Sequence, residues 1–194
     1  MFETAPTARA DLKVGAVYAV TGENGWIYYA QVTPSKDLAF FRFRSRDLAT
    51  VDALFGSPAM STITVAAPSI TRALRAGAWK HLGRRQLADG LEAPALHGQW
   101  PAGTLNVTIW QAGAPAFDTR ADDPAIQAIE LMAVWDAEAH IPQRLTADFG
   151  EEEAAWHVGG PIWRERLIRE ERARRWPDQP AHRLPPDWVS TKVR

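Results

Sequence analysis

Two segments rich in β-branched and aromatic residues, separated by a polar turn, predict a β-hairpin near the start of the chain. They are residues 13–21 (KVGAVYAVT) and 26–33 (WIYYAQVT). Between them, Asn24-Gly25 supplies the positive φ angles that a tight hairpin turn requires. The turn-forming stretch PSKD follows, so residues 38–44 are expected to form the third strand of a meander.

The third predicted strand, LAFFRFRSRD, interleaves three phenylalanines with three arginines. Alternate side chains of a strand face opposite ways, which puts Phe41, Phe43 and Ser45 on one face and Phe40, Arg42, Arg44 and Arg46 on the other. The first face is predicted to be core, and the second a solvated row of arginines. Nucleic-acid binding would require aromatic and basic side chains together on an exposed face, where only Phe40 qualifies, so a sheet strand is the preferred interpretation.

The rest of the chain predicts short helices and strands, followed by one longer helix. Short helices are expected at 47–56, from Pro68 to Gly77, and from Pro142 to Gly150. Strands are expected at 61–67, 79–82 and 104–111, with a polar break at 118–124. Residues 126–135 are apolar and fit either a helix or a strand, and we interpret them as a strand.

Residues 161–176 carry the strongest helix signal, because opposite charges recur at i, i+4 spacing. The predicted pairs are Glu165 with Arg169, Arg166 with Glu170, Glu170 with Arg174, and Glu171 with Arg175. The apolar stripe of this helix is narrow, which predicts a helix on the protein surface. The proline-containing tail, 178–194, is expected to be extended.

Together these elements predict an α+β fold. It would contain an antiparallel β-meander or small barrel-like sheet, short peripheral helices and one longer charged C-terminal helix. The expected division is an α+β body, 1–158, and a charged helix with a proline-rich C-terminal extension, 159–194. The 194 residues suffice for one main core.

Charge and composition narrow the function classes. The formal net charge is -1, so general attraction to nucleic acid is not expected. Charge is nevertheless uneven, because residues 118–153 hold ten acidic and two basic side chains, whereas 159–194 hold nine basic and five acidic ones. Cysteine is absent, and no apolar run resembles a signal peptide or membrane span. These features predict a cytoplasmic protein with no membrane partner.

The chain shows no recognisable catalytic or cofactor motif. Glycine-rich phosphate loops, a Gly-x-Ser-x-Gly elbow and an HExxH pattern do not occur. We therefore predict no cofactor, no metal and no catalytic residue, and expect that the protein is not an enzyme. The best metal candidate is His140 with His157 and the acidic run 151–153, but a solvated charge cluster is the simpler interpretation.

The middle of the chain resembles the immunity protein 26 family of bacterial polymorphic toxin systems over about residues 10–150. The resemblance rests on the segments 70–87 (ITRALRAGAWKHLGRRQL) and 133–145 (AVWDAEAHIPQRL). Its matching positions are Gly15, Tyr18, Trp26, Tyr29, Val32, Gly77, Trp79, Gly83, Arg84 and Leu87, together with the stretch LAFFRFRS. Family membership would imply that the protein neutralises a toxin.

The leading hypothesis is thus an immunity or antitoxin-type protein that neutralises a cognate toxin domain by binding. If that toxin is a basic nuclease, acidic side chains would face its active-site cleft. The predicted partner-binding residues are Asp118, Asp122, Asp123, Glu130, Asp136 and Glu138. The alternative is a small enzyme or ligand-binding protein with a tryptophan-lined pocket.

Overall fold

The computed structural model describes residues 1–150 and 159–191. The chain forms two compact units, each built from two separate segments. Unit 1 contains Met1–Ala95 and Ala133–Val158, and unit 2 contains Leu96–Met132 and Gly159–Arg194. The predicted α+β class is confirmed. The units divide the chain differently from the predicted boundary at 158, because 96–132 belongs with the C-terminal residues.

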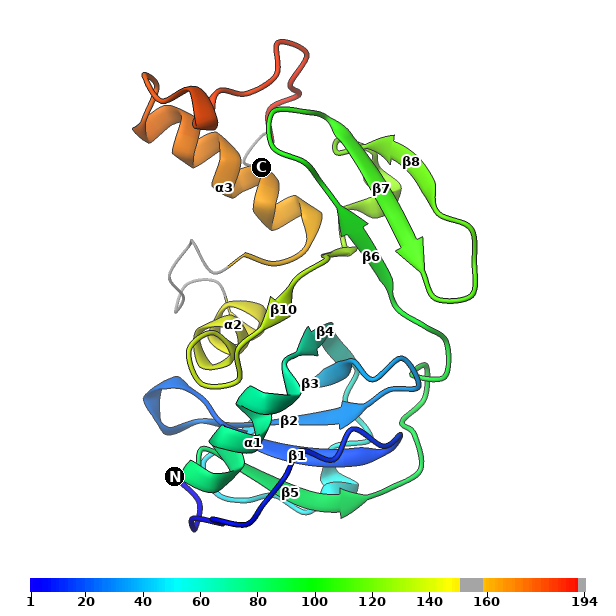
Figure 1. Cartoon of the computed structure of the whole chain (residues 1–194), viewed down its shortest axis with the longest axis vertical. Helices are drawn as coiled ribbons and strands as arrows, with labels where there is room; N and C mark the ends of the chain where they lie inside the picture. The colour runs from blue at the N-terminus through cyan, green and yellow to red at the C-terminus, as the bar shows by residue number, and fades with distance from the viewer. Residues whose placement is uncertain (151–158, 192–194) are drawn as a thin grey trace. The chain divides into compact units, whose positions relative to one another are not determined.

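In unit 1, six strands of the described chain form one curled sheet in the order β10-β4-β3-β2-β1-β5 (Figure 1). They are β1 (Ala16–Thr21), β2 (Ile27–Val32), β3 (Leu38–Ser45), β4 (Ala59–Val65), β5 (Trp79–Arg84) and β10 (Val134–Trp135). All neighbours pair antiparallel except β10 and β4. The predicted hairpin is confirmed, with φ of 55° at Asn24 and 74° at Gly25 in the turn.

One face of this sheet is covered by α1 (Ala67–Ala76) and α2 (Ile141–Phe149), as Figure 1 shows for α1. Ile70 and Leu74 of α1 and Leu145 of α2 pack with sheet side chains in one apolar cluster. Both helices lie where the sequence predicted helices. The first ends at Gly77, whose φ of 75° terminates the helix in the left-handed region that glycine favours.

The other face of the sheet is also apolar, which corrects the prediction for β3. Phe40 belongs to the cluster under the helices, whereas Phe41 belongs to a second cluster that includes Leu54 and Leu91. Both phenylalanines are buried. On the face of β3 that was expected to be solvated, Phe40 is therefore buried and only the residues from Arg42 onward can meet solvent. The reason is that separate chain segments cover each of the two faces of the sheet.

The helix predicted at 47–56 is wrong, since the structure has only a 3₁₀ turn at Val51–Ala53. Side chains of the sheet form hydrogen bonds with backbone groups of this segment, in competition with a helix. The Ala49 N–H donates to the Tyr29 hydroxyl, and the Ser45 hydroxyl donates to the Asp47 carbonyl. The segment is thereby held as a loop over the second face.

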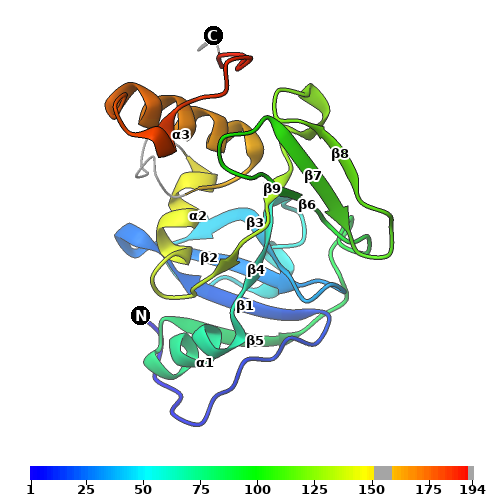
Figure 2. The same cartoon turned by 45° about the horizontal axis from the view of Figure 1, so that its top comes forward.

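Within 96–132 and 159–191, four strands form the sheet of unit 2 in the order β8-β7-β6-β9 (Figure 2). These are β6 (Leu96–Gln99), β7 (Asn106–Gln111), β8 (Phe117–Arg120) and β9 (Glu130–Leu131). The expected polar break at 118–124 thus begins with strand residues. The single strand interpreted at 126–135 is instead a 3₁₀ turn at Pro124–Ile126 and the separate strands β9 and β10.

Helix α3 (Ile162–Arg175) matches the predicted charged helix, but its charges are used differently. Ile162 packs in the apolar cluster of unit 2, and Arg164 and Arg166 are buried. Of the predicted pairs, Glu165 with Arg169 forms at 3.0 Å, whereas Arg174 pairs with Glu171. The helix is therefore not a solvated surface rod, and it contributes buried cations to its unit.

Candidate functional site

The six predicted acidic residues are divided between the units. Asp118, Asp122, Asp123 and Glu130 lie in unit 2, whereas Asp136 and Glu138 lie in unit 1. Sequence proximity placed them in one segment, but that segment crosses from one unit to the other after residue 132. Their local surroundings differ from one residue to the next.

Asp122 and Asp123 are occupied by local contacts. Arg120 donates from Nε and Nη2 to the two carboxylate oxygens of Asp122 at 3.0 and 3.2 Å. This hydrogen bonding lowers the pKa of Asp122. Asp123 accepts from the Ala125 N–H and the Thr119 hydroxyl, which lower its pKa, and thereby caps the 3₁₀ turn. Both carboxylates therefore already have structural roles.

The two acidic residues of unit 1 lie just before the start of α2. Asp136 accepts from the Ala139 and Glu138 N–H groups, which lower its pKa, and pairs with Arg72 at 2.7 Å. Glu138 lies 3.6 Å from the same guanidinium. Arg72 thus offsets much of the negative charge at this position, and Glu138 is the more exposed carboxylate.

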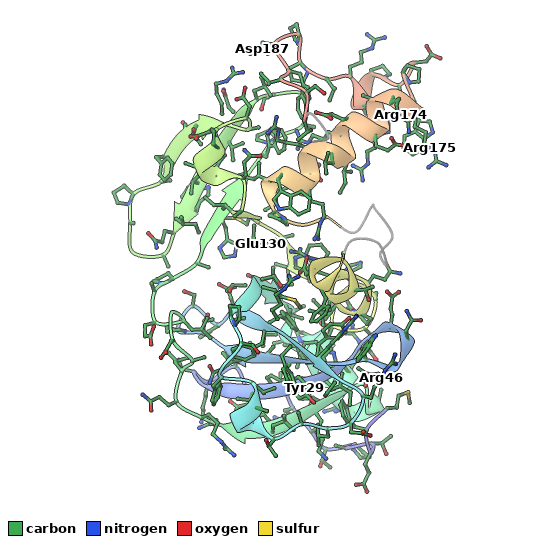
Figure 3. All side chains as sticks on the ribbon, turned by 180° about the vertical axis from the view of Figure 1, so that it is seen from behind. Tyr29, Arg46, Glu130, Arg174, Arg175 and Asp187 are labelled. Carbon is green, nitrogen blue, oxygen red and sulfur yellow. The ribbon has the colours of Figure 1, made fainter. Side chains whose placement is uncertain are left out.

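Glu130 does not lie at the surface. Glu130, labelled in Figure 3, lies on β9, where it pairs with His97 of β6. The residue is only 8% exposed. A binding partner contacts exposed groups, so the structure gives Glu130 an interior location rather than the predicted surface one.

The acidic residue with the most open surroundings is Asp118, on the edge strand β8 (Figure 2). It shares one face of the β7–β8 ribbon with Thr108, whose hydroxyl donates to the carboxylate at 2.6 Å. Trp110, two residues further along β7, is 45% exposed on that same face. Phe117, on the opposite face, is 52% exposed. We call Trp110 and Asp118, which share one face, the ribbon patch.

Arg44 of β3 and Arg46, which follows the strand, are stacked on aromatic rings of unit 1. Arg46 and Arg44 lie 3.7 and 4.1 Å from the centre of the Trp26 ring, and Arg44 is 4.1 Å from that of Phe149. Arg42 donates to the backbone carbonyls of Asp148 and Phe149. Because the guanidinium groups already cover these rings, the arrangement does not offer free aromatic faces for nucleic-acid bases.

Of the predicted metal candidate, His157 and the acidic run 151–153 lie outside the described residues. His140 accepts a hydrogen bond from the Asp136 N–H through Nδ1 and packs edge-on against Trp135. Among residues 1–150 and 159–191, no cluster of three or more potential ligands is suited to a metal ion. A tryptophan-bordered cavity does occur, but in unit 2, beside Trp188.

One cluster of ionisable residues was missed from the sequence. The Asp11 carboxylate accepts from Arg84 at 2.9 Å and lies 3.7 Å from His81 Nε2, while the Tyr18 hydroxyl donates to the Asp11 carbonyl. Burial raises the pKa of Tyr18 to about 12 and lowers that of His81. About seventy residues separate Asp11 from Arg84, so no local motif signals the cluster. Its contacts tie the N-terminal segment to β1 and β5.

Several residues that carry the family resemblance have evident structural roles. A Cβ at Gly15 would lie 2.2 Å from the Arg85 carbonyl oxygen, and Gly15 has a φ of 82°. Trp79 is buried in the core and Arg84 pairs with Asp11. These positions therefore explain the fold of unit 1 rather than identify a binding surface.

Comparison with protein-family models, curated proteins and solved structures found no match to this chain. No helix within the described ranges has the length and apolar character needed to cross a membrane.

Proposed function

We propose that this protein is a cytoplasmic immunity or antitoxin-type protein that neutralises a cognate toxin domain by binding, without catalysis. The observation that carries this proposal is the ribbon patch, where Trp110 of β7 is 45% exposed on the same face as Asp118 of the edge strand β8. The resemblance of about residues 10–150 to the immunity protein 26 family supports the same function.

The composition of the patch suits a protein partner. Large aromatic side chains supply much of the binding energy in many interfaces, because they bury a large area with few rotatable bonds. Trp110 is such a side chain, because it is about half exposed on the face that also carries Asp118. An apolar surface of this kind is expected to become buried when a partner docks.

The charge of the patch favours a basic partner. Asp118 is exposed, and its only described hydrogen bond comes from the neutral hydroxyl of Thr108, so its negative charge is not offset by a nearby cation. Asp122, by contrast, is paired with Arg120. A toxin nuclease domain with a basic cleft would complement Asp118 and gain little from Asp122.

The test is to co-express the protein with a toxin-like domain encoded beside it, and to measure survival and the affinity of the purified pair. Trp110→Ala is expected to weaken binding about tenfold or more, as truncation of an aromatic hot spot does. Asp118→Asn is expected to weaken it several-fold and to reduce its salt dependence.

Two matched substitutions serve as controls. Asp122→Asn removes a carboxylate of the same unit that Arg120 already neutralises, and Asp178→Asn removes an exposed carboxylate of the tail. Both are expected to leave affinity unchanged. Unchanged affinity in Trp110→Ala and Asp118→Asn would remove the ribbon patch from the proposal, and continued toxicity with the intact protein would overturn the immunity function itself.

A further inference from the structure

A cavity of about 110 Å³ lies within unit 2, between α3 and the C-terminal tail. Its walls are Glu165, Arg169 and Arg172 of α3, residues 181–185 and Trp188 of the tail, and Ala102 and Gly103 before β7. The tail turns at Pro180–His182 and runs back beside the helix, as Figure 1 shows. The cavity is thus lined by three stretches of one unit and is partly open to solvent.

The charge of these walls is strongly positive. Three arginines and His182 face a single carboxylate, that of Glu165, among the lining residues. Glu165 is already paired with Arg169 at 3.0 Å. Burial lowers the pKa of Arg169, Glu165 raises it, and the positive charge of Arg172 lowers it further. The lining therefore has an excess of positive charge that its own acidic residue does not balance.

Arg169 supports the wall of the cavity rather than supplying free donors. Its Nη2 and Nη1 donate to the carbonyls of Trp100 and Pro101 at 3.0 and 3.3 Å. Its guanidinium also lies 3.6 Å from the centre of the Trp100 ring. Trp100 in turn stacks on Trp188 at 5.8 Å with an angle of 9° between the rings. The resulting stack holds one wall rigid.

The tail is fixed to α3 by a second set of contacts. Glu170 accepts from Trp188 Nε1 at 2.9 Å and from the hydroxyl and N–H of Thr191 at 2.5 Å. Arg166 donates to the Val189 carbonyl at 2.8 Å. The cavity is therefore held open by its own framework, which is the condition for binding a ligand without a large ordering cost.

Two lining arginines have guanidinium groups that are not committed to this framework. Within residues 1–150 and 159–191, the side chains of Arg172 and Arg183 make no hydrogen bond and no ion pair. Arg172 is half-buried on α3, and Arg183 is exposed on the tail. His182, beside Arg183, packs its ring against Trp176. Cationic donors thus come to the cavity from two separate elements.

We propose that this cavity binds a small phosphate ligand, inorganic phosphate or the phosphate end of a small phosphate monoester. A tetrahedral phosphate accepts hydrogen bonds from several directions, which suits guanidinium forks that come from a helix and from a tail. The volume is on the order of a few water molecules, enough for a phosphate group and its nearest atoms but not for a dinucleotide. This ligand site is independent of the ribbon patch.

The experiment is a titration of the full chain with inorganic phosphate, in which calorimetry measures the affinity. The unfolding temperature is measured at the same phosphate concentrations and at constant ionic strength. Phosphate is expected to raise the unfolding temperature above that in chloride, because a ligand that binds only the folded state stabilises it. Sodium acetate at the same ionic strength tests a carboxylate ligand. Equal stabilisation by acetate and phosphate would overturn the choice of phosphate.

The substitutions Arg172→Gln and Arg183→Gln are each expected to weaken phosphate binding about tenfold, as loss of a charge-assisted contact does. Arg174→Gln is the matched control, because Arg174 is on the same helix, is exposed and does not line the cavity (Figure 3). Arg172→Lys keeps the positive charge but not the paired N–H donors of the guanidinium group. It is expected to give an intermediate loss of phosphate affinity. Absence of binding by the unaltered protein, or an equal loss in Arg174→Gln, would overturn the proposal.

Discussion

The two units use arginine differently, although each also places an arginine over a tryptophan ring, Arg46 over Trp26 and Arg169 over Trp100. In unit 1, Arg44 and Arg46 lie over aromatic rings at the margin of a sheet whose two faces are packed with apolar side chains. In unit 2, Arg164 and Arg166 are buried in the helix that covers the smaller apolar cluster. The contrast indicates that apolar burial stabilises unit 1, whereas hydrogen bonds from buried cations contribute a larger share in unit 2.

Arg144 is a buried arginine in unit 1, and its partners differ from those of the buried Arg166 in unit 2. It is fully buried, and its Nε donates to Asp148 at 2.9 Å one turn along α2. Its charge is therefore balanced by a carboxylate. Arg166 in unit 2 donates instead to the neutral carbonyl groups of Gln127 and Val189. Arg166 thus joins separate segments of chain through neutral acceptors, whereas Arg144 pairs with a carboxylate of its own helix and also lies 5.0 Å from the centre of the Trp135 ring.

The largest effect is expected from Trp79→Ala in unit 1. Trp79 is 1% exposed, packs against Tyr18 and Phe40, and donates from Nε1 to the Ala137 carbonyl. Its removal is expected to cost about 3–5 kcal/mol of unfolding free energy, from lost burial and the cavity left behind. Denaturant unfolding measures the change, with the half-exposed Trp110→Ala as control. Similar losses in both would contradict the apolar account of unit 1.

A smaller loss is expected from Arg166→Met in unit 2. Methionine keeps the apolar stem but leaves the Gln127 and Val189 carbonyl oxygens without their donor. We expect a cost of about 2–3 kcal/mol, as for hydrogen bonds from a charged group. Arg174→Met, at an exposed position of α3, is expected to change stability by less than about 0.5 kcal/mol. Equal losses of unfolding free energy in Arg166→Met and Arg174→Met would contradict a special contribution of buried cations to the stability of unit 2.

A weaker, pH-dependent effect is expected from the Asp11 cluster of unit 1. Burial lowers the pKa of His81 in the folded protein. Below about pH 6.5, His81 is therefore protonated more readily in the unfolded chain than in the folded one. Stability should therefore fall as the pH drops through this range. The side chain of His81 is 36% exposed, which limits the size of the effect.

Unfolding temperatures at a series of pH values test this, with His81→Gln as the comparison. The variant should lose the part of the slope near pH 6. Asp11 acts in the same direction at lower pH, since its folded pKa is also lowered. A rise in stability of the unaltered protein on acidification from pH 7 to about pH 5 would show that the sign is wrong.

The smallest effect is expected from Arg46→Gln. Arg46 is exposed, stacks on Trp26 and donates to the Asn24 carbonyl. An exposed cation–π contact contributes about 0.5–1 kcal/mol. Arg9→Gln, at an exposed position, is the control and is expected to change stability by less than about 0.5 kcal/mol. A loss on the scale of that expected for Trp79→Ala would mean that unit 1 also relies on its arginines.

Elements that depend on local signals could be predicted from the sequence. Asn24-Gly25 specified its hairpin, and Gly77 specified the end of α1, because each provides a backbone conformation that few residues adopt. The predicted helix at 47–56 failed because its competitor, Tyr29, is distant in sequence. In the same way, the burial of Phe40 depends on α1 and α2, which no periodicity within β3 reveals.

The candidate sites show the same limit. Residues 118–153 formed an acidic segment by count, yet Arg72, 64 positions from Asp136, offsets part of that charge. Conversely, the cavity beside Trp188 combines α3, the tail and Gly103, which are far apart in the chain. Sequence patterns identify residue types suited to binding, whereas their neutralisation or assembly depends on long-range packing.

The interleaved order of the two units has a consequence for biosynthesis. Strands β6 to β9 leave the ribosome before α3, whose Ile162 completes the apolar cluster of unit 2. Most of the sheet of unit 1 is by then available to fold, since β1 to β5 precede residue 85. Unit 2 must wait for its C-terminal segment. A nascent chain halted before residue 159 would therefore carry strands with an uncovered apolar face, a target for chaperones or proteases during translation.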